Sequence, residues 1–259
     1  MIYSDVFVAI IFFFGAAIGS FIAASVYRLA NRKPIARGRS ECVFCRYQLS
    51  FYELVPLLSF IFLRGRCRQC KKPISRGDFF VELAAGILFV LPVVFYNGDL
   101  FDLRFLLSLL RDWIFLGSLL FLFLYDLKYR QLPDIVGLPA AIALFVLNFF
   151  LGFGIYDLIL GVAIGGGFFL LQYLVSRGKW VGDGDIRLGA LLGAGLGFPG
   201  IIPALFIAYI IGGFVSAYLL LKKKTTLQSQ IAFGTFLALG GAVALFWGAK
   251  IINWYLGLI

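Results

Sequence analysis

Long apolar stretches, separated by short polar segments, follow one another along almost the whole chain. They fall at residues 6–27, 79–96, 105–127, 135–152, 156–175, 186–198, 201–221 and 231–257. Most have the ~20 residues that a helix needs to cross the hydrocarbon core of a bilayer. They lack the alternation of strands, and lipid leaves no backbone polar group solvated, so helices are favoured. The pattern predicts an all-α polytopic membrane protein with about eight transmembrane helices.

Two of these stretches leave alternatives open. The third is interrupted by Arg111 and Asp112, so residues 101–111 either lie along the membrane interface or contain a local ion pair within one helix. The sixth is short and holds glycines at positions 189, 193, 195 and 197. It either packs closely against a neighbouring helix through these small residues or tilts little.

Composition narrows the class of protein further. The chain is 62% hydrophobic and 14% charged, against about a quarter charged in soluble domains, so no sizeable soluble domain is expected. The first stretch has no basic residues before it, which predicts a first membrane helix rather than a cleavable signal peptide. The net charge is +10, but no basic face interleaved with aromatic side chains is evident, so nucleic acid is not an expected partner. Histidine is absent, which excludes a Ser-His-Asp triad and a His-liganded catalytic metal.

The basic residues predict the orientation in the membrane. Twenty of the 23 Lys and Arg residues lie in residues 28–76, 128–130, 177–187 and 222–224. With eight spans these segments share one side, which is then cytoplasmic, and both termini lie outside. The short connections at 96–102, 152–157 and 197–200 face outward. The expected parts are a first transmembrane helix (1–30), a cytoplasmic cysteine loop (31–78) and transmembrane helices 2–8 (79–259).

All four cysteines lie in the loop after the first stretch, as two C-x-x-C pairs with 21 residues between them. Cys42, Cys45, Cys67 and Cys70 suit a tetrahedral Zn²⁺ site, which with four thiolates would be structural. A cytoplasmic location disfavours disulfides, while unmetallated thiols and a redox pair stay open as alternatives. The intervening segment 51–63 is amphipathic at best; it lies either on the membrane surface or in a small zinc-ordered lid without chemistry of its own.

Acidic residues stand at the ends of two apolar stretches on the same predicted side. Asp126 ends the third stretch, and Asp183 and Asp185 precede the sixth. An ionisable residue at such a place is a functional candidate. Two carboxylates that meet in a low dielectric share one proton, so one can activate a water while the other polarises a peptide carbonyl. This is the chemistry of an aspartyl protease.

The neighbours of these acids allow other interpretations. Gly182 and Gly184 let an extended substrate backbone approach closely. Alternatively, Asp183 or Asp185 caps a helix that begins near Ile186, with Asp183 otherwise solvated. Asp134, which follows Pro133, is an expected N-cap of the fourth stretch.

Four ordered motifs then identify a family. The segment "GSFIAASVYRL" (19–29), the two cysteine pairs with "VPLLSFIFLRGRCRQCKKPIS", the D-x6-P-D segment "YDLKYRQLPDIVGLP" and "GDGDIRLGALLGA" follow one another in the chain. With these motifs the chain resembles the prepilin leader peptidases, which are GxGD intramembrane aspartyl proteases. The resemblance implies catalytic residues at Asp126 and Asp185, with Gly182, Gly184, Pro133 and Asp134 as supporting motif positions.

The resemblance also implies substrates, a place and a second activity. The family removes the basic leader of type IV prepilins and pseudopilins at the cytoplasmic face of the inner membrane. Many members then methylate the new N-terminal amine with S-adenosylmethionine. Ala23 and Gly77-Asp78-Phe79 depart from the family pattern near the loop associated with methyl transfer, whereas Glu82 is kept. A peptidase without methyltransferase activity is therefore the alternative.

Other functions have less support. A proton-coupled carrier also uses intramembrane carboxylates, but the chain shows no internal repeat, and its carboxylates stand at the membrane edge. A methyltransferase without protease function and a non-catalytic scaffold built on the zinc loop are disfavoured because both aspartates are present. The expected partners are prepilins or pseudopilins and membrane lipid, and the sequence predicts no particular oligomeric state. The acidic Asp134 and Asp183 are expected to attract the lysines of a basic leader.

Overall fold

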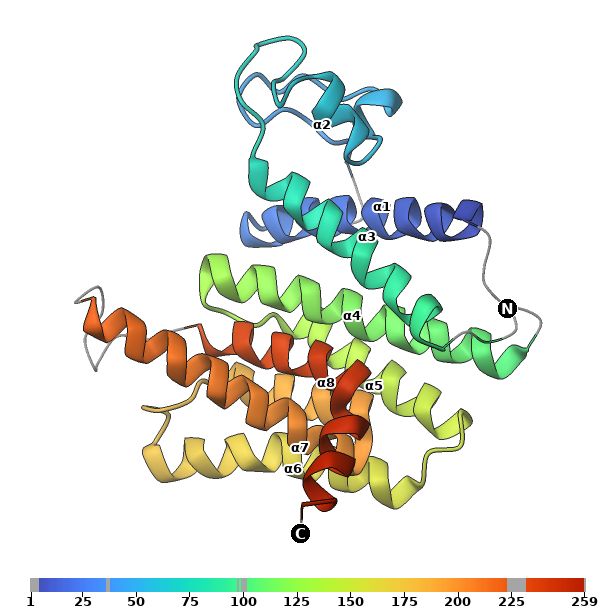
Figure 1. Ribbon diagram of the computed structural model, residues 1–259. Coiled ribbons are helices and arrows are strands. Elements are labelled where there is room, and N and C mark those ends of the chain that lie inside the picture. Colours follow the sequence, from blue (N-terminus) through green and yellow to red (C-terminus); the bar gives the residue numbers. More distant parts are fainter. Residues whose placement is uncertain (1–4, 36–37, 97, 99–101, 223–231, 259) are drawn as a thin grey trace. The chain divides into compact units, whose positions relative to one another are not determined.

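The regular structure of the protein is helical, as predicted. The computed structural model describes residues 5–35, 38–96, 98, 102–222 and 232–258. In chain order these residues form α1 (Asp5–Ala30), η1 (Phe51–Leu54), α2 (Leu58–Phe62), α3 (Arg76–Tyr96), α4 (Leu103–Tyr129), α5 (Asp134–Phe150), α6 (Ile155–Ser176), α7 (Asp183–Leu221) and α8 (Phe233–Leu256) (Figure 1). Within the described residues, six helices are long and apolar enough to cross a membrane, and α5 is a shorter apolar helix. The predicted positions Lys223 and Lys224 lie outside the described residues.

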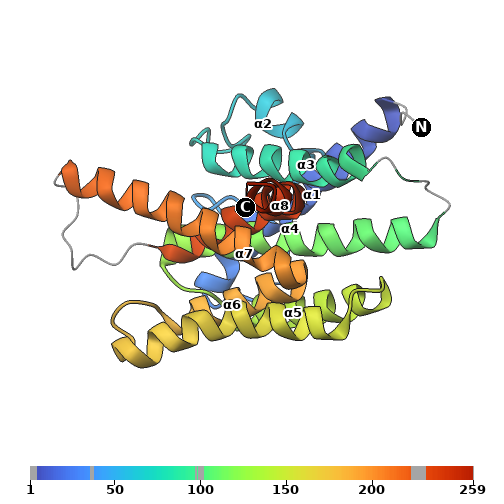
Figure 2. The same cartoon turned by 60° about the horizontal axis from the view of Figure 1, so that its bottom comes forward.

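The helix α7 joins two of the predicted stretches, 186–198 and 201–221. Its backbone leaves the helical conformation at Gly197, where φ is 63°, and at Phe198. Phe169 of α6 lies close to Gly189 before this break and stacks on Tyr209 after it. Residues on either side of the break therefore share a neighbour, which means that α7 consists of two arms and that the chain reverses direction between them (Figure 2).

A buried polar cluster supports this reversal. A helix broken at Gly197 and followed by Pro199, which has no N–H, leaves carbonyl groups without their usual donors. The Asn148 side-chain amide donates to the carbonyl oxygens of Ala194 at 2.8 Å and Gly195 at 3.0 Å. Asn148 is fully buried and is oriented in turn by Arg111, whose Nη1 donates to its Oδ1 at 3.1 Å.

The charged pair in the third predicted stretch belongs to this cluster. Arg111 Nε lies 2.6 Å from Oδ1 of Asp112, and both side chains are buried within the uninterrupted helix α4. The local ion pair is therefore confirmed. Residues 103–111 do not form a separate segment along the membrane interface, because α4 begins at Leu103 and continues through the pair.

The chain divides into two compact units, residues 1–99 and 100–259. In the first, α1 packs against α3 through small residues. A Cβ atom added at Gly15 would stand 2.6 Å from Cβ of Phe89, and one added at Gly19 would stand 2.6 Å from Cβ of Ala85. Glycines four apart let two membrane helices approach this closely. The predicted three-part division at residues 30 and 78 stays a prediction.

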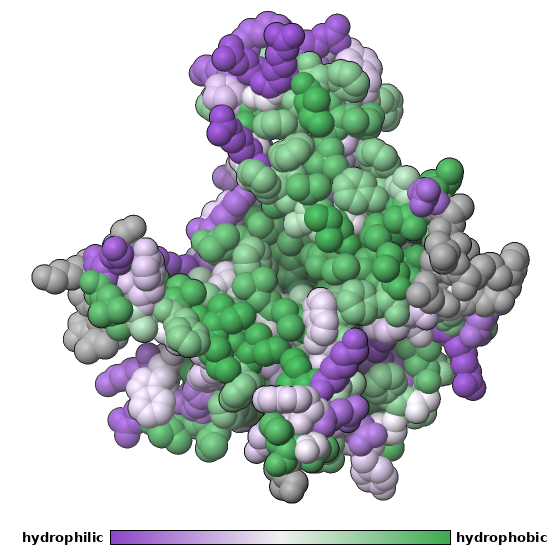
Figure 3. All heavy atoms as spheres, viewed as in Figure 1, coloured by the Kyte–Doolittle hydropathy of each residue, from purple (hydrophilic) through white to green (hydrophobic). Residues whose placement is uncertain are grey.

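The cysteine loop of the first unit is a small lobe at the start of α3, and we call residues 41–75 the cysteine lobe. It contains η1, α2 and two isolated β-bridges, Glu41–Gln48 and Arg66–Pro73. On the face shown in Figure 3, hydrophilic residues cover the end of the lobe farthest from α1 and α3. Hydrophobic residues cover its side nearer to these helices.

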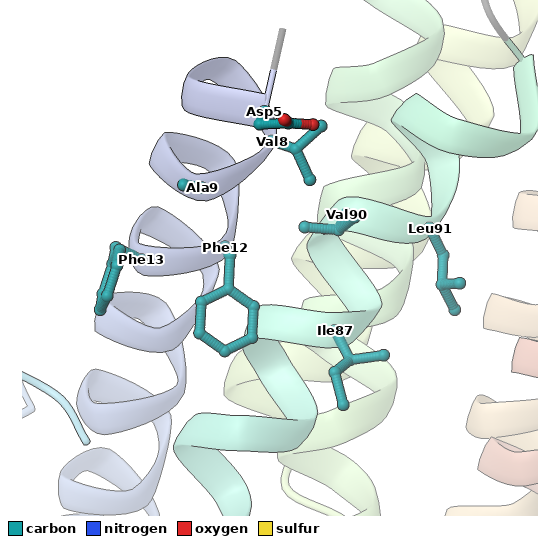
Figure 4. Close-up of a pocket in the computed structure, with 8 residues that line it drawn as sticks. All are labelled: Asp5, Val8, Ala9, Phe12, Phe13, Ile87, Val90 and Leu91. Carbon is teal, nitrogen blue, oxygen red and sulfur yellow. The ribbon is translucent and has the colours of Figure 1, made fainter. Parts of the chain in front are cut away.

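At the other end of α1 and α3 lies an apolar groove of about 490 Å³. Phe12 of α1 and Ile87 and Val90 of α3 line it, and Asp5 is its charged residue (Figure 4). Because its lining is aliphatic and aromatic apart from Asp5, it offers no pair of catalytic groups.

In the second unit, α6 and the first arm of α7 are in direct backbone contact. Gly161 and Gly165 of α6 face Gly193 and Gly189 of α7, and a Cβ added at Gly161 would stand 2.7 Å from the carbonyl oxygen of Gly193. The sixth predicted stretch therefore packs closely against a neighbouring helix through its glycines, which was one of the two alternatives for this stretch. This contact fixes the arm that begins with Asp183 and Asp185.

Candidate active site

Asp126 lies in the last turn of α4 and is held by the beginning of α8. Its side chain is 5% exposed, and Oδ2 accepts a hydrogen bond from the backbone N–H of Thr235 at 2.9 Å. The first N–H groups of a helix have no partner within the helix and attract negative charge, so a carboxylate fits this position. A Cβ added at Gly234 would stand 2.8 Å from the same oxygen, so a larger residue there would push the carboxylate away from this position.

Asp185 lies in the first turn of α7 and is 8% exposed. The helix begins at Asp183, three residues before the predicted start, and Gly182 is its N-cap. Asp185 Oδ2 accepts the N–H of Gly182 at 3.2 Å, as the third residue of a capping box does. The alternative that Asp185 contributes to capping is therefore correct, although it is not the N-cap itself.

The two aspartates belong to one site. A Cβ added at Gly184 would stand 2.9 Å from Cβ of Leu132, and one added at Gly234 would stand 3.1 Å from Cδ1 of the same leucine. Leu132 thus lies between the start of α7 and the start of α8, next to both carboxylate-bearing turns. Two buried carboxylates, at the end of α4 and at the start of α7, therefore stand in turns that share Leu132 as a neighbour.

Two further predicted acids stand on the exposed side of this site. Arg187 donates a hydrogen bond to Asp134 and another, at 2.8 Å, to Asp183. The prediction that Asp134 is an N-cap is wrong: α5 begins at Asp134, Pro133 holds the N-cap position, and the carboxylate pairs with Arg187 instead. Capping by Asp183 is also wrong, because Gly182 is the N-cap, whereas its solvation is correct, since its side chain is 68% exposed.

Sequence reasoning missed a polar pair close to the start of α8. The hydroxyl of Tyr209, on the second arm of α7, exchanges hydrogen bonds of 2.9 and 3.0 Å with the side-chain amide of Gln172 on α6. The ring of Tyr209 lies 5.0 Å from the ring of Phe233, next to the turn that holds Asp126. The sequence did contain a sign of this pair, because a hydroxyl and an amide side chain stand within otherwise apolar stretches.

The four cysteines come together as predicted. Their sulfur atoms all lie within 4.8 Å of one another, with 3.8 Å between Cys42 and Cys70 and 4.0 Å between Cys45 and Cys67. Four sulfurs bound tetrahedrally to zinc at about 2.3 Å would stand about 3.8 Å apart. The donor set and its spacing therefore fit Zn²⁺.

The backbone of the lobe builds two equivalent turns around these sulfurs. The carbonyl of Cys42 accepts the N–H of Arg46, and the carbonyl of Cys67 accepts the N–H of Lys71. Arg46 and Lys71 both adopt a left-handed conformation, with φ of 57° and 59°. The equal geometry means that each C-x-x-C pair presents its two sulfurs to the same point.

The thiol pKa values also favour a cation at this point. Burial raises the pKa of the Cys42 thiol, but the N–H groups of Cys45 and Phe44 donate to its sulfur and lower the pKa to about 7. For Cys45, the N–H of Tyr47 lowers the pKa, but desolvation and the neighbouring thiols raise it to about 11. The negative charge of one thiolate disfavours ionisation of the neighbouring thiol. A divalent cation between the sulfurs would compensate this repulsion.

Comparison with known proteins agrees with this geometry. Two family models match the chain: the bacterial peptidase A24 N-terminal domain over residues 13–96, and the type IV leader peptidase family over residues 113–217. Proteins named prepilin leader peptidase/N-methyltransferase from Aeromonas hydrophila, Legionella pneumophila and Bacillus subtilis (strain 168) are 30%, 34% and 29% identical to the chain. These alignments cover 96%, 85% and 96% of this chain and 93%, 76% and 97% of the three relatives. No solved structure matches.

Proposed function

The chain belongs to the type IV leader peptidase family, and from this premise we propose that it is an intramembrane aspartyl endopeptidase that removes the basic leader from type IV prepilins or pseudopilins. Asp126 and Asp185 are the proposed catalytic pair. The observation that supports this assignment is that two buried carboxylates, one at the end of α4 and one at the start of α7, stand in turns that share Leu132 as a neighbour. The protein is a multi-pass protein of the inner membrane, since six of its described helices are long and apolar enough to span it.

The proposed reaction uses one proton shared by the pair. One carboxylate takes a proton from a water molecule, whose oxygen attacks the carbonyl carbon of the scissile peptide. The other, protonated, donates a hydrogen bond to the carbonyl oxygen as negative charge develops there. The C–N bond then breaks, and a carboxyl group returns a proton to the leaving amine. No histidine, serine or catalytic metal is needed.

The ends of α4 and α7 suit such a substrate. Asp126 lies one turn before the end of α4 at Tyr129, and Asp185 lies in the first turn of α7, so both stand at the boundary of their spans. A prepilin has a basic leader that stays in water and an apolar helix that stays in lipid. We propose that its scissile bond therefore comes to rest at this depth on the cytoplasmic side, with both termini of the enzyme outside.

The acids around Arg187 are proposed to attract the leader. Asp134 and Asp183 share this single guanidinium, so one negative charge remains unbalanced on the exposed side of the site. Asp183→Asn should weaken cleavage of lysine-rich leaders more than cleavage of neutral ones, because it removes that charge. Equal effects on both leaders would refute the attraction.

The cysteine lobe is proposed to hold Zn²⁺ through Cys42, Cys45, Cys67 and Cys70. A zinc ion with four thiolates has no open coordination position, so it would order the lobe and not take part in hydrolysis. The spacing of the four sulfurs supports this proposal.

Methylation of the new N-terminus is the second candidate activity. The relatives are named as N-methyltransferases as well as peptidases. S-adenosylmethionine would supply the methyl group to the amine. Glu82 stands where the lobe meets α3, and its Oε2 accepts the N–H of Leu57 at 2.8 Å, so a fixed carboxylate is available to face a cationic group. A peptidase without this activity is the alternative.

One experiment tests both activities. The purified protein cleaves a prepilin in detergent, and mass spectrometry reads the mature N-terminus with and without S-adenosylmethionine. Asp126→Asn and Asp185→Asn should each abolish cleavage, whereas Asp157→Asn, a carboxyl exchange in the first turn of α6, should not. Unimpaired cleavage by either aspartate variant would mean that the pair is structural. An unmethylated product from the wild type in the presence of S-adenosylmethionine would support peptidase activity without methyltransferase activity.

A further inference from the structure

The cysteine lobe is fastened to the beginning of a transmembrane helix. The backbone N–H of Leu57 donates to Glu82 in the second turn of α3, and the ring of Phe60 lies 5.1 Å from that of Phe79 in the first turn. Because α3 is long and apolar enough to span a membrane and begins at Arg76, these contacts hold the lobe beside the end of a candidate span.

Large apolar side chains of the lobe remain exposed. Phe51 is 83% exposed and Phe62 is 80% exposed, and the helix α2, which ends at Phe62, buries none of its five residues. The other exposed large apolar residues of the lobe are Val43, Phe44, Tyr52, Leu54, Val55, Leu58 and Ile61. Large exposed apolar patches mark sites of protein or membrane contact.

Basic side chains interleave with these rings. Lys72 Nζ lies 4.7 Å from the centre of the Phe44 ring, and the Arg68 guanidinium lies 5.4 Å from that of Tyr52. The lobe exposes six Lys and Arg residues: Arg46, Arg64, Arg66, Arg68, Lys71 and Lys72. Of its two acidic residues, Glu53 is buried and Glu41 is paired with Lys33. From the sequence, no basic face interleaved with aromatic residues was expected. The lobe has one, so that expectation is wrong.

We propose that this surface of the cysteine lobe binds the anionic phospholipids of the membrane in which the helices stand. Aromatic and aliphatic side chains would enter the headgroup region, and the cations beside them would bind lipid phosphates, as in amphipathic segments at membrane interfaces. The hydrophobic side of the lobe is the one nearer to α1 and α3, which agrees with this orientation (Figure 3). A basic leader peptide is a poor fit, because the lobe has the same sign of charge.

Lipid is also favoured over nucleic acid by the attachment of the lobe. Nucleic acid would have to reach a surface whose apolar residues stand beside the start of α3, whereas lipid headgroups are already there. The binding requires no substrate and does not depend on the proposed peptidase activity. The proposed lipid binding also gives a role to the exposed apolar residues of segment 51–63, which the ordering of the lobe by zinc does not explain.

The test places an environment-sensitive fluorescent amino acid at position 62 of the full chain, with a second variant that has the same probe at Gln48, an exposed polar position of the same lobe. Both variants are reconstituted in nanodiscs of phosphatidylcholine alone and of phosphatidylcholine with phosphatidylglycerol. Quenching is measured with headgroup-region nitroxide lipids and, separately, with acrylamide in the water. The expected result is lipid quenching at position 62 that increases with phosphatidylglycerol, together with protection from acrylamide, and weaker lipid quenching at position 48.

The charged part of the surface is tested in the same samples. Neutralising Arg68 and Lys72 together should shift the lobe away from the anionic bilayer, by roughly fivefold in the equilibrium for each basic residue lost. Free acrylamide access at position 62 in both bilayers would overturn the proposal. Protection from both quenchers would also overturn it, since protein would then cover the surface. A probe signal that changes when an oligonucleotide is added, but does not depend on lipid composition, would assign the surface to nucleic acid instead.

Discussion

Replacing Gly234 with alanine should disturb the proposed catalytic pair without unfolding the protein. The added Cβ would stand 2.8 Å from Oδ2 of Asp126, whereas ordinary van der Waals contact begins at 3.4 Å. The carboxylate is the free end of a side chain and can move, so the cost in stability should be small. Moving away by about 0.6 Å would, however, stretch its 2.9 Å hydrogen bond to the N–H of Thr235.

The expected loss of activity follows from the size of that movement. A misplacement of 1 Å can cost about 10²-fold in rate, so a shift of about 0.6 Å should lower kcat by on the order of tenfold. The assay is prepilin cleavage in detergent, beside thermal unfolding followed by tryptophan fluorescence. Gly167→Ala is the matched control, because a Cβ there meets no atom within 4 Å. Full activity of Gly234→Ala, or a loss that merely parallels a lower Tm, would refute this reasoning.

Three other perturbations have clear expected outcomes. Asn148→Leu should lower the free energy of unfolding by roughly 2–4 kcal/mol, since it leaves the carbonyls at the reversal of α7 and the buried Nη1 of Arg111 without their partner. Denaturation in detergent measures this, and an unchanged stability would contradict the role of the cluster. Arg187→Gln should lower KM for lysine-rich leaders at low salt and not for neutral ones, because the change frees the carboxylates of Asp134 and Asp183 from their cation. A higher KM would contradict an attraction between these acids and the leader. Cys70→Ser should lower the zinc content of the purified protein, measured by elemental analysis, and increase amide hydrogen exchange in the cysteine lobe, while cleavage persists. Zinc retained at wild-type affinity would argue against a four-sulfur site.

Local sequence predicted the helices well because hydrophobic length is a property of consecutive residues. Every predicted apolar stretch is helical within the described residues, and the two stretches joined in α7 are its two arms. The meeting of the four cysteine sulfurs was also predictable, since a C-x-x-C turn places its own two sulfurs and a second pair completes the tetrahedron.

Contacts between distant residues were beyond such reasoning. Asp134 follows the N-cap rule by position, yet Arg187, 53 residues later, takes its carboxylate. The donation of Asn148 to a carbonyl 46 residues away shows the same limitation. The aspartates themselves could be named from motifs, but Leu132, Gly234 and Tyr209 around them became visible only once α7 and α8 were in position.

The central claim is that Asp126 and Asp185 act as one catalytic unit, and a double-mutant comparison tests it most directly. Cleavage rates are measured for Asp126→Asn, Asp185→Asn and the double variant with the same prepilin. If the two carboxylates share one proton, each single change should lower the rate by about the same factor, ~10²–10⁴-fold, and the double change should lower it no further. Two independent losses that multiply in the double variant would contradict the account.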